Sequence, residues 1–144
     1  MWIELIRSYC EDCEFSESAS SKDIETVEHE LNVSLPGSLT SVLLESNGIV
    51  GENGLGLLWA TDRIRSENLN FRTREDFKGL YMPFDHLLFF ADAGNGDQFA
   101  YPIQNGQINR NDIFVWNHED DRRTWAAPDL KRYFEWWLTG EMGI

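Results

Sequence analysis

The sequence "FFADAGNGDQFAYPI", residues 89–103, carries the clearest local signal in the chain. An apolar run stops at a cluster of small and polar residues, and a stretch that alternates apolar and polar residues follows. Asn95-Gly96, placed between two strand patterns, is the strongest short-range signal for a β-hairpin, because both residues tolerate a positive φ. Turn chemistry does not explain why Asp92 and Asp97 flank the turn, so a phosphate-binding loop and the carboxylate corner of an active site are the alternatives.

Further strand patterns lie on both sides of this turn. Residues 87–91 form an unbroken apolar run, which is typical of a central strand buried on both faces. Residues 98–103 alternate, and Pro102 indicates that this strand lies near an edge or a bulge. Residues 113–116 predict another strand, and residues 57–60 predict a short one.

Helical patterns occupy the first third of the chain. Apolar residues at helical spacing predict a helix over residues 2–13. Ser21 is expected to be the N-cap of the next helix. Pro36 suits the first turn of a third helix, and Asn47-Gly48 predicts its end.

The order of the elements along the chain indicates the fold class. Pro128 is expected to open a last helix that ends at Gly140. Residues 62–78 are charged and poorly periodic, so we expect a surface excursion with at most one helical turn. Helices followed by strands and a final helix favour an α+β fold, with a mostly antiparallel central sheet flanked by N-terminal helices and a C-terminal helix. The length suits a single domain over residues 1–144.

The formal net charge of −13 limits the partners. An acidic chain repels phosphate backbones, so direct nucleic-acid binding is disfavoured. The same field attracts a basic protein and speeds the encounter, although solubility alone is an alternative reason for the charge. The chain has no run of about 18 apolar residues and no signal-peptide pattern, so we expect a soluble, cytoplasmic protein without a membrane span.

Cys10-Glu11-Asp12-Cys13 has the C-x-x-C spacing of some redox and zinc sites. A reactive thiol needs an electropositive setting, whereas Glu11 and Asp12 make this setting acidic. A zinc site needs four ligands, and the chain has no second pair of cysteines. We therefore interpret the motif as chance spacing on a helix.

Two other motifs could carry chemistry. Residues 51–56 contain three glycines, but their spacing does not match a dinucleotide loop and Glu52 repels phosphate, so we interpret them as a tight loop. Residues 118–121 place a histidine and three carboxylates in a row, and neighbouring residues of a strand cannot all converge. A charged loop is the favoured interpretation, a polar binding face the second, and catalysis the third. No catalytic residue, cofactor or metal site is predicted.

Two stretches together resemble a known family. Residues 24–48 carry Ile24, Glu28, Leu35-Pro36 and Asn47-Gly48 in an order that resembles the N-terminal signature of the SUKH superfamily, of the Smi/Knr type. Residues 89–138 resemble its second half, with a strand, Gly-x-Gly-Asp, an aromatic strand, a further strand that leads to His-Glu, and a final helix. The resemblance covers about residues 20–140.

This resemblance implies an α+β fold, a non-catalytic binding role and no cofactor. Bacterial members of the family are mostly immunity proteins that bind and neutralise a cognate polymorphic toxin, often a nuclease, whereas fungal relatives are regulators and scaffolds. We therefore expect an immunity protein, or antitoxin, for a basic toxin domain. A regulatory scaffold for an endogenous protein is the alternative, and an enzyme that uses Asp92, Asp97 and His118 is a distant third.

The expected partner-binding surface lies at the ends of the strands and is acidic. The carboxylates there flank turns, so we expect them to be solvated and free to meet a partner. Most of the six tryptophans are expected in the core, and one is expected to anchor the partner. The predicted contact residues are Asp92, Asn95, Asp97, His118, Glu119, Asp120, Asp121 and Trp125.

Overall fold

Residues 1–142 are described by the computed structural model, and they form five α-helices and seven β-strands. The α+β prediction is confirmed. In chain order the elements are α1 (Trp2–Tyr9), β1 (Glu14–Phe15), α2 (Ser21–Leu31), α3 (Gly37–Leu43), β2 (Ile49–Val50), β3 (Gly56–Leu58), α4 (Thr61–Thr73), β4 (Leu87–Gly94), β5 (Asp97–Pro102), β6 (Ile113–Trp116), β7 (Arg123–Ala127) and α5 (Leu130–Thr139).

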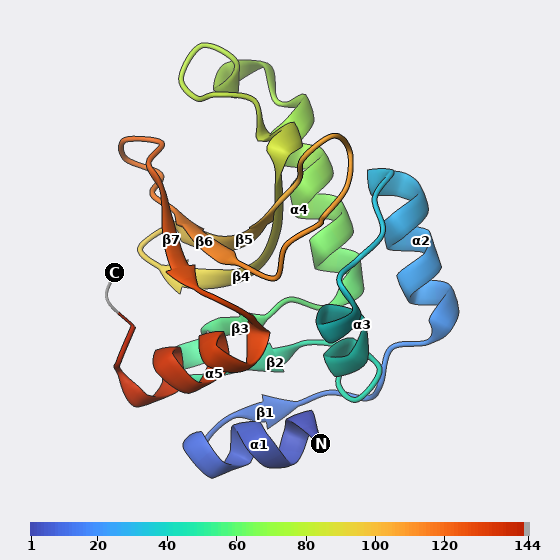
Figure 1. Ribbon diagram of the computed structural model, residues 1–144, viewed down its shortest axis with the longest axis vertical. Coiled ribbons are helices and arrows are strands. Elements are labelled where there is room, and N and C mark those ends of the chain that lie inside the picture. The colour runs from blue at the N-terminus through green and yellow to red at the C-terminus, as the bar shows by residue number, and fades with distance from the viewer. Residues whose placement is uncertain (143–144) are drawn as a thin grey trace.

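The strands form two antiparallel sheets that meet. One sheet has the order β1-β2-β3, and the larger sheet has the order β4-β5-β6-β7. The main-chain N–H of Trp59, directly after β3, donates to the Phe90 carbonyl of β4 at 2.8 Å, which joins the two sheets. Figure 1 shows α4 beside the β4 end of the larger sheet and α5 beneath its β7 end.

The hairpin prediction is confirmed. β4 ends at Gly94 and β5 begins at Asp97, and these two residues are paired across the turn. Asn95 and Gly96 have φ values of 58° and 88°, as a two-residue turn with both central residues in the left-handed region requires. The opening stretch is therefore a hairpin, and β4 continues three residues past the expected end at Ala91.

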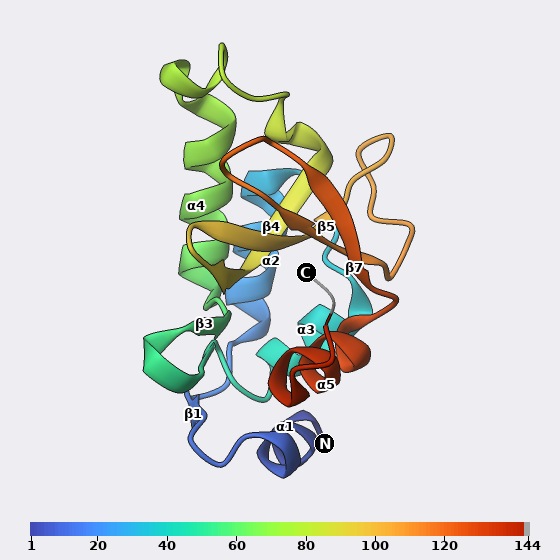
Figure 2. The same cartoon turned by 90° about the vertical axis from the view of Figure 1, so that its left-hand side faces the viewer.

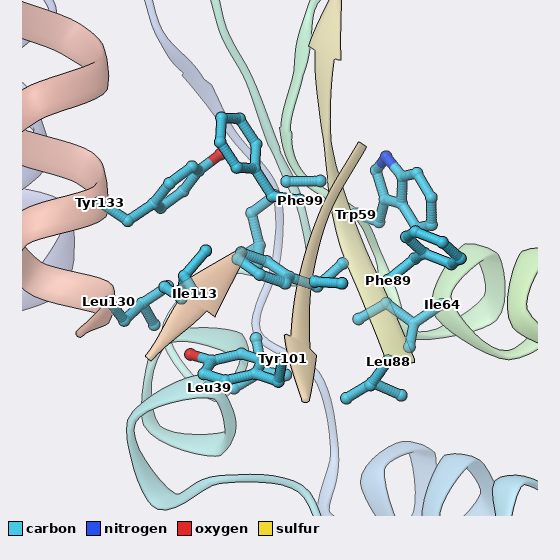
Figure 3. Packing of buried hydrophobic residues seen from close by; sticks show 14 of the residues in the cluster. Leu39, Trp59, Ile64, Leu88, Phe89, Phe99, Tyr101, Ile113, Leu130 and Tyr133 are labelled. Atoms are coloured by element: carbon cyan, nitrogen blue, oxygen red, sulfur yellow. The ribbon is translucent and has the colours of Figure 1, made fainter. Parts of the chain in front are cut away.

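Aromatic side chains fill the space on both sides of the larger sheet. Phe89 packs edge-to-face against Trp116 at 5.7 Å between ring centroids. Phe99 packs against Tyr133 of α5 at 4.8 Å, and Figure 3 shows this pair on the other side of the strands from Phe89. Each fully buried ring contributes about 1.5–3 kcal/mol relative to exposure, so the aromatic residues dominate the core.

Helix α4 covers the free edge of β4 (Figure 2). The buried side chain of Asn68 accepts a hydrogen bond from the Phe89 N–H at 2.9 Å and donates one to the Phe89 carbonyl at 2.9 Å. One helical turn later, Arg72 Nη2 donates to the Leu87 carbonyl at 3.2 Å. These two side chains thus satisfy main-chain groups that would otherwise pair with another strand.

The sequence-based interpretation of residues 62–78 as a surface excursion is wrong, because Thr61–Thr73 is a regular helix. Its inward positions include Ile64 and Asn68, both of which are fully buried. A polar side chain at an inward position weakens the apolar periodicity that identifies a helix. Only residues 75–77, a short 3₁₀ turn, and the loop after them resemble the expected excursion.

Helix α1 ends four residues earlier than expected. Its last helical residue is Tyr9, and Cys10 is an extended C-cap residue. Cys10 and Cys13 form a disulfide, so the interpretation of this motif as chance spacing on a helix is wrong. Acidic neighbours disfavour a reactive thiolate, but they do not prevent two cysteines this close from being oxidised.

Other helix boundaries differ by small steps. The N-cap of α2 is Ser20, not Ser21, and it forms a capping box with Asp23. Helix α3 has Pro36 as its N-cap and ends before Leu44, not at Asn47-Gly48. The N-cap of α5 is Asp129, whose side chain accepts from the Arg132 N–H at 2.8 Å. The sequence also did not predict β7, whose alternation is interrupted by a register shift.

The bonds of Asn68 generate a prediction about stability. We expect Asn68→Leu to lower the free energy of unfolding by about 3 kcal/mol, because it leaves both main-chain groups of Phe89 without partners in the core. Asn70→Leu, on the exposed face of the same helix, is the control and should change it by less than about 0.5 kcal/mol. Urea unfolding of both variants measures the difference. Equal stability of the two variants would contradict the role of Asn68.

Candidate partner-binding site

Two hairpin turns meet at one end of the larger sheet. Residues 94–97 join β4 to β5, and residues 117–122 join β6 to β7. Because β5 pairs with β6, both turns lie at the same end of the strands. We call these two segments the two-turn surface.

Asp97 and His118 hold the two turns together. The Asp97 Oδ1 atom lies 2.7 Å from His118 Nδ1 and accepts a second hydrogen bond, at 3.1 Å, from the His118 main-chain N–H. The histidine ring also packs closely against Gly96, where an added Cβ atom would lie 3.2 Å from the ring. The structure thus brings Gly96 and Asp97 of the first turn together with His118 of the second.

The Asp97–His118 pair has the geometry of an acid–base dyad, but its surroundings supply no nucleophile. No hydroxyl or thiol hydrogen-bonds to the His118 side chain within residues 1–142. A carboxylate that accepts a hydrogen bond from Nδ1–H fixes the orientation of an imidazole ring. This bond occurs in histidines with a structural role as well as in catalytic ones. In this position the pair fixes the relative placement of the two turns.

Asp92 forms an ion pair with Arg63 and does not belong to the two-turn surface. Its carboxylate accepts two hydrogen bonds from Arg63 of α4, at 2.9 and 3.0 Å. The guanidinium group of Arg63 also lies 4.3 Å from the ring centroid of Trp59. Gly56 makes room for the pair, because an added Cβ atom there would lie 2.5 Å from an Asp92 oxygen. Asp92 therefore connects β4 with α4 and β3.

The carboxylates of the β6–β7 turn differ from one another. Glu119 and Asp120 are exposed, as expected, and Asp120 lies 3.5 Å from Arg122. The expectation that Asp121 is solvated is wrong, because its side chain is only 13% exposed. Arg122 and Arg123 follow directly and partly compensate the negative charge of this turn.

Asp121 ties the β6–β7 turn to the loop after α4. Its Oδ2 atom accepts from the Met82 N–H at 2.8 Å, and its Oδ1 atom accepts from Trp116 Nε1 at 2.8 Å and from Arg123 at 3.1 Å. Burial acts to raise the pKa of Asp121, but these hydrogen bonds and the charge of Arg123 outweigh it and hold the pKa below its usual range. The residue has φ 63°, which aspartate tolerates better than most residues.

Trp125 is the one predicted contact residue that exposes a large apolar side chain. The residue is 46% exposed, whereas Trp2, which was expected in the core, is buried together with Trp59 and Trp116. The indole Nε1 atom donates to Asp112 at 2.8 Å, and the ring lies edge-to-face with Trp136 of α5, at 6.3 Å between centroids. The ring is thus held in one orientation on β7.

A surface hollow of about 650 Å³ lies between the two-turn surface and the end of α5. Its apolar part is contributed mainly by Val115, Trp137 and Met142, and its polar part by Asn95, Asp97, Asn117, Arg122 and Thr124. Of these residues, only Asn95 and Asp97 were predicted from the sequence as contact residues. Asn117 and Arg122 flank the acidic turn, so the sequence could have predicted them as contact residues. Trp137 follows the helical stripe of α5 and was therefore assigned to the core.

Among the described residues, neither a metal-binding cluster nor a membrane-spanning helix is present. No group of three His, Cys, Asp or Glu side chains within residues 1–142 is arranged to hold a metal ion. No helix in this part of the chain is long and apolar enough to cross a membrane. The groups that the site presents are hydrogen-bonding side chains, charged side chains and the exposed ring of Trp125.

The bonds of Asp121 generate a prediction about pH. Because its folded-state pKa is lowered, its carboxylate stabilises the fold above the unfolded-state pKa of about 3.9 and loses this effect as pH falls through the folded-state pKa. We expect Asp121→Asn to lower the free energy of unfolding at neutral pH by about 1–3 kcal/mol, and this deficit to shrink below about pH 4. Asp120→Asn is the exposed control. A deficit that stays constant down to pH 2 would contradict the assignment.

A comparison with protein-family models gives one match. The model SUKH_6, described as SMI1-KNR4 cell-wall, matches residues 21–134. The match runs from the start of α2 into α5 and includes both hairpin turns, Trp125 and the Asn68 contact, but not α1 or the disulfide. None of the curated proteins compared with the chain matches it. Because the family match covers most of the chain, this protein belongs to the SMI1-KNR4 (SUKH) family.

Proposed function

We propose that this protein is an immunity protein that binds and neutralises a cognate bacterial toxin domain in the cytoplasm of the cell that makes it. The observation that carries the proposal is membership of the SUKH family, whose bacterial members are mostly of this type. The net charge of −13 supports a basic partner, of which a nuclease domain is one kind. The toxin is neutralised by being covered, and no step of this proposal requires catalysis by the chain.

Binding is proposed to use the two-turn surface together with Trp125. Exposed carboxylates such as Glu119 and Asp120 lie at its rim, where charges act chiefly on the rate of encounter. The fixed ring of Trp125 and the hollow beside Trp137 offer the buried anchoring that rim charges cannot supply. Asp121 and Asp92 support this surface through their internal bonds.

A regulatory scaffold is the second candidate function. The description of the family model, SMI1-KNR4 cell-wall, favours it, because it refers to a cell-wall role instead of a toxin. The two functions differ in the identity of the partner and not in the chemistry of binding.

Growth rescue distinguishes the two functions. A toxin-like reading frame next to the gene is expressed in a sensitive host, with and without this chain. The immunity proposal expects growth only when the chain is present, together with a stable complex of the two purified proteins. Continued toxicity with no complex, while an endogenous partner is bound, would favour the scaffold.

Charge and aromatic substitutions should affect different rate constants. We expect Glu119→Lys to slow association with the toxin domain several-fold at low salt and to change dissociation little. Glu25→Lys changes the net charge equally but lies on α2, on the far side of the molecule in Figure 1, and should slow association less. Trp125→Ala should instead speed dissociation about 30-fold, equivalent to about 2 kcal/mol. Equal association rates for both lysine variants across ionic strength would contradict the acidic rim.

The disulfide is proposed to be unnecessary for binding. Cys10 and Cys13 lie outside the family match and outside the two-turn surface. A cytoplasmic protein also meets thiol reductants that oppose disulfides. We expect the double variant Cys10→Ser/Cys13→Ser to bind the toxin domain within about twofold of the parent, as measured by calorimetry. A large loss of affinity in the folded variant would show that the N-terminal segment takes part.

A further inference from the structure

The two edges of the larger sheet differ in how their main-chain groups are hydrogen-bonded. The β4 edge is occupied, because Asn68 and Arg72 bond to Phe89 and Leu87, and the main chain of Trp59 bonds to Phe90. Within residues 1–142 the β7 edge has no such cover, since β6 is the one strand with which β7 pairs there. An uncovered edge presents main-chain donors and acceptors that fit another strand.

The hydrogen-bond pattern identifies the free groups on β7. The Asn117 N–H donates to the Arg122 carbonyl at 2.8 Å, so this carbonyl points toward β6, whereas the Arg122 N–H donates to Asp120 at 2.9 Å within the turn. Pairs alternate along an antiparallel ladder, so Thr124 bonds to β6, while the N–H and C=O groups of Arg123 and Trp125 point outward. Within residues 1–142, no hydrogen bond outside the strand ladder uses these main-chain groups.

The side chains of β7 leave this edge accessible. A charged residue often protects an edge strand, but the guanidinium group of Arg123 is held inward by the carbonyls of Met82 and Pro83, at 3.0 and 3.2 Å. Thr124 and Trp125 carry no charge and are exposed. The register shift near Ala126 ends the regular ladder, so the open stretch is short and needs side-chain anchors as well.

We propose that the partner docks by adding an extended, basic segment to the outer edge of β7, as a fifth strand of this sheet. The inference rests on the proposed function and specifies its docking mode. Alternate side chains of an added strand point to opposite faces. One set reaches the hollow beside Thr124 and Val115, and the other set lies next to the Trp125 ring.

Charge complementarity specifies the chemistry of the segment. Exposed Glu119 and Asp120 lie at the turn that leads into β7, and the chain as a whole carries −13. A lysine in the added strand can lay its aliphatic stem on Trp137. Because Asp97 already binds His118 and Arg122 lines the same hollow, the attraction for its ammonium group comes from Glu119, Asp120 and the net charge of the chain. A second copy of the chain offers the wrong charge for the same edge.

A peptide selection tests the docking mode without the toxin. Random 12-residue peptides are displayed and selected against the full chain, and the tightest binders are synthesised. We expect alternating basic and β-branched residues, and slower hydrogen exchange of the Arg123 and Trp125 amides on binding.

The matched variants Trp125→Ala and Trp125→Pro both remove the ring, but only the proline removes the outward N–H, which an edge strand tolerates. Trp125→Pro should bind about tenfold more weakly than Trp125→Ala.

Three results would overturn the docking mode: no selected binder, binders that leave the two amides unprotected, or equal binding by the alanine and proline variants. Light scattering that shows a dimer whose formation protects the same amides would assign the edge to a second copy and would also overturn it. Circular dichroism confirms that both variants fold. Growth rescue remains a separate readout. Rescue without edge binding would refute only the docking mode, and edge binding without rescue would refute only the immunity function.

Discussion

The buried side chain of Asn68 binds the main chain of Phe89 and so fixes how α4, β4 and the small sheet are placed. One carboxamide provides both the donor and the acceptor that a neighbouring strand would provide. It places α4 along β4, and the adjacent Phe90 carbonyl receives the Trp59 N–H, which joins the small sheet to the large one. The Arg63–Asp92 pair then forms between the same helix and strand. A buried main-chain group without a hydrogen-bond partner destabilises the fold by more than a surface contact stabilises it. Alternative placements of α4 are therefore disfavoured.

Helix α4 covers the β4 edge of the larger sheet. The two-turn surface, by contrast, is exposed at the end of the strands where both hairpins turn. Asp97 and His118 hold the two hairpin turns in fixed relation, and Asp121 fastens the second turn to the loop after α4. This leaves the rim carboxylates, the hollow and the Trp125 ring on a surface whose supports are internal. A rigid surface loses little conformational entropy on binding, which favours a tight complex with a partner of complementary charge. We propose that the partner binds at this end of the sheet.

The sequence alone predicted the elements whose physical signals are local. Asn95-Gly96 specifies its own turn, and the apolar stripe through Tyr133 specifies α5. The order of these helices and strands along the chain was then sufficient to predict the α+β fold class. Helix α4 was missed because a buried amide at position 68 serves the main chain of a strand that is distant in sequence. Asp121 was expected in solvent because its partner, the Met82 N–H, is 39 residues away. The resemblance to the SUKH family was recognised from ordered motifs and is confirmed, whereas the contact surface remains a prediction.

The difference between the two sheet edges can be measured directly in the free protein. Hydrogen exchange followed residue by residue compares the Phe89 amide on the covered edge with the Arg123 and Trp125 amides on the open edge. We expect the Phe89 amide to exchange as slowly as the centre of the core, because Asn68 accepts its hydrogen bond. The Arg123 and Trp125 amides should exchange faster by several orders of magnitude, since no group in residues 1–142 covers them. Equally slow exchange of all three amides in the monomer would contradict the account.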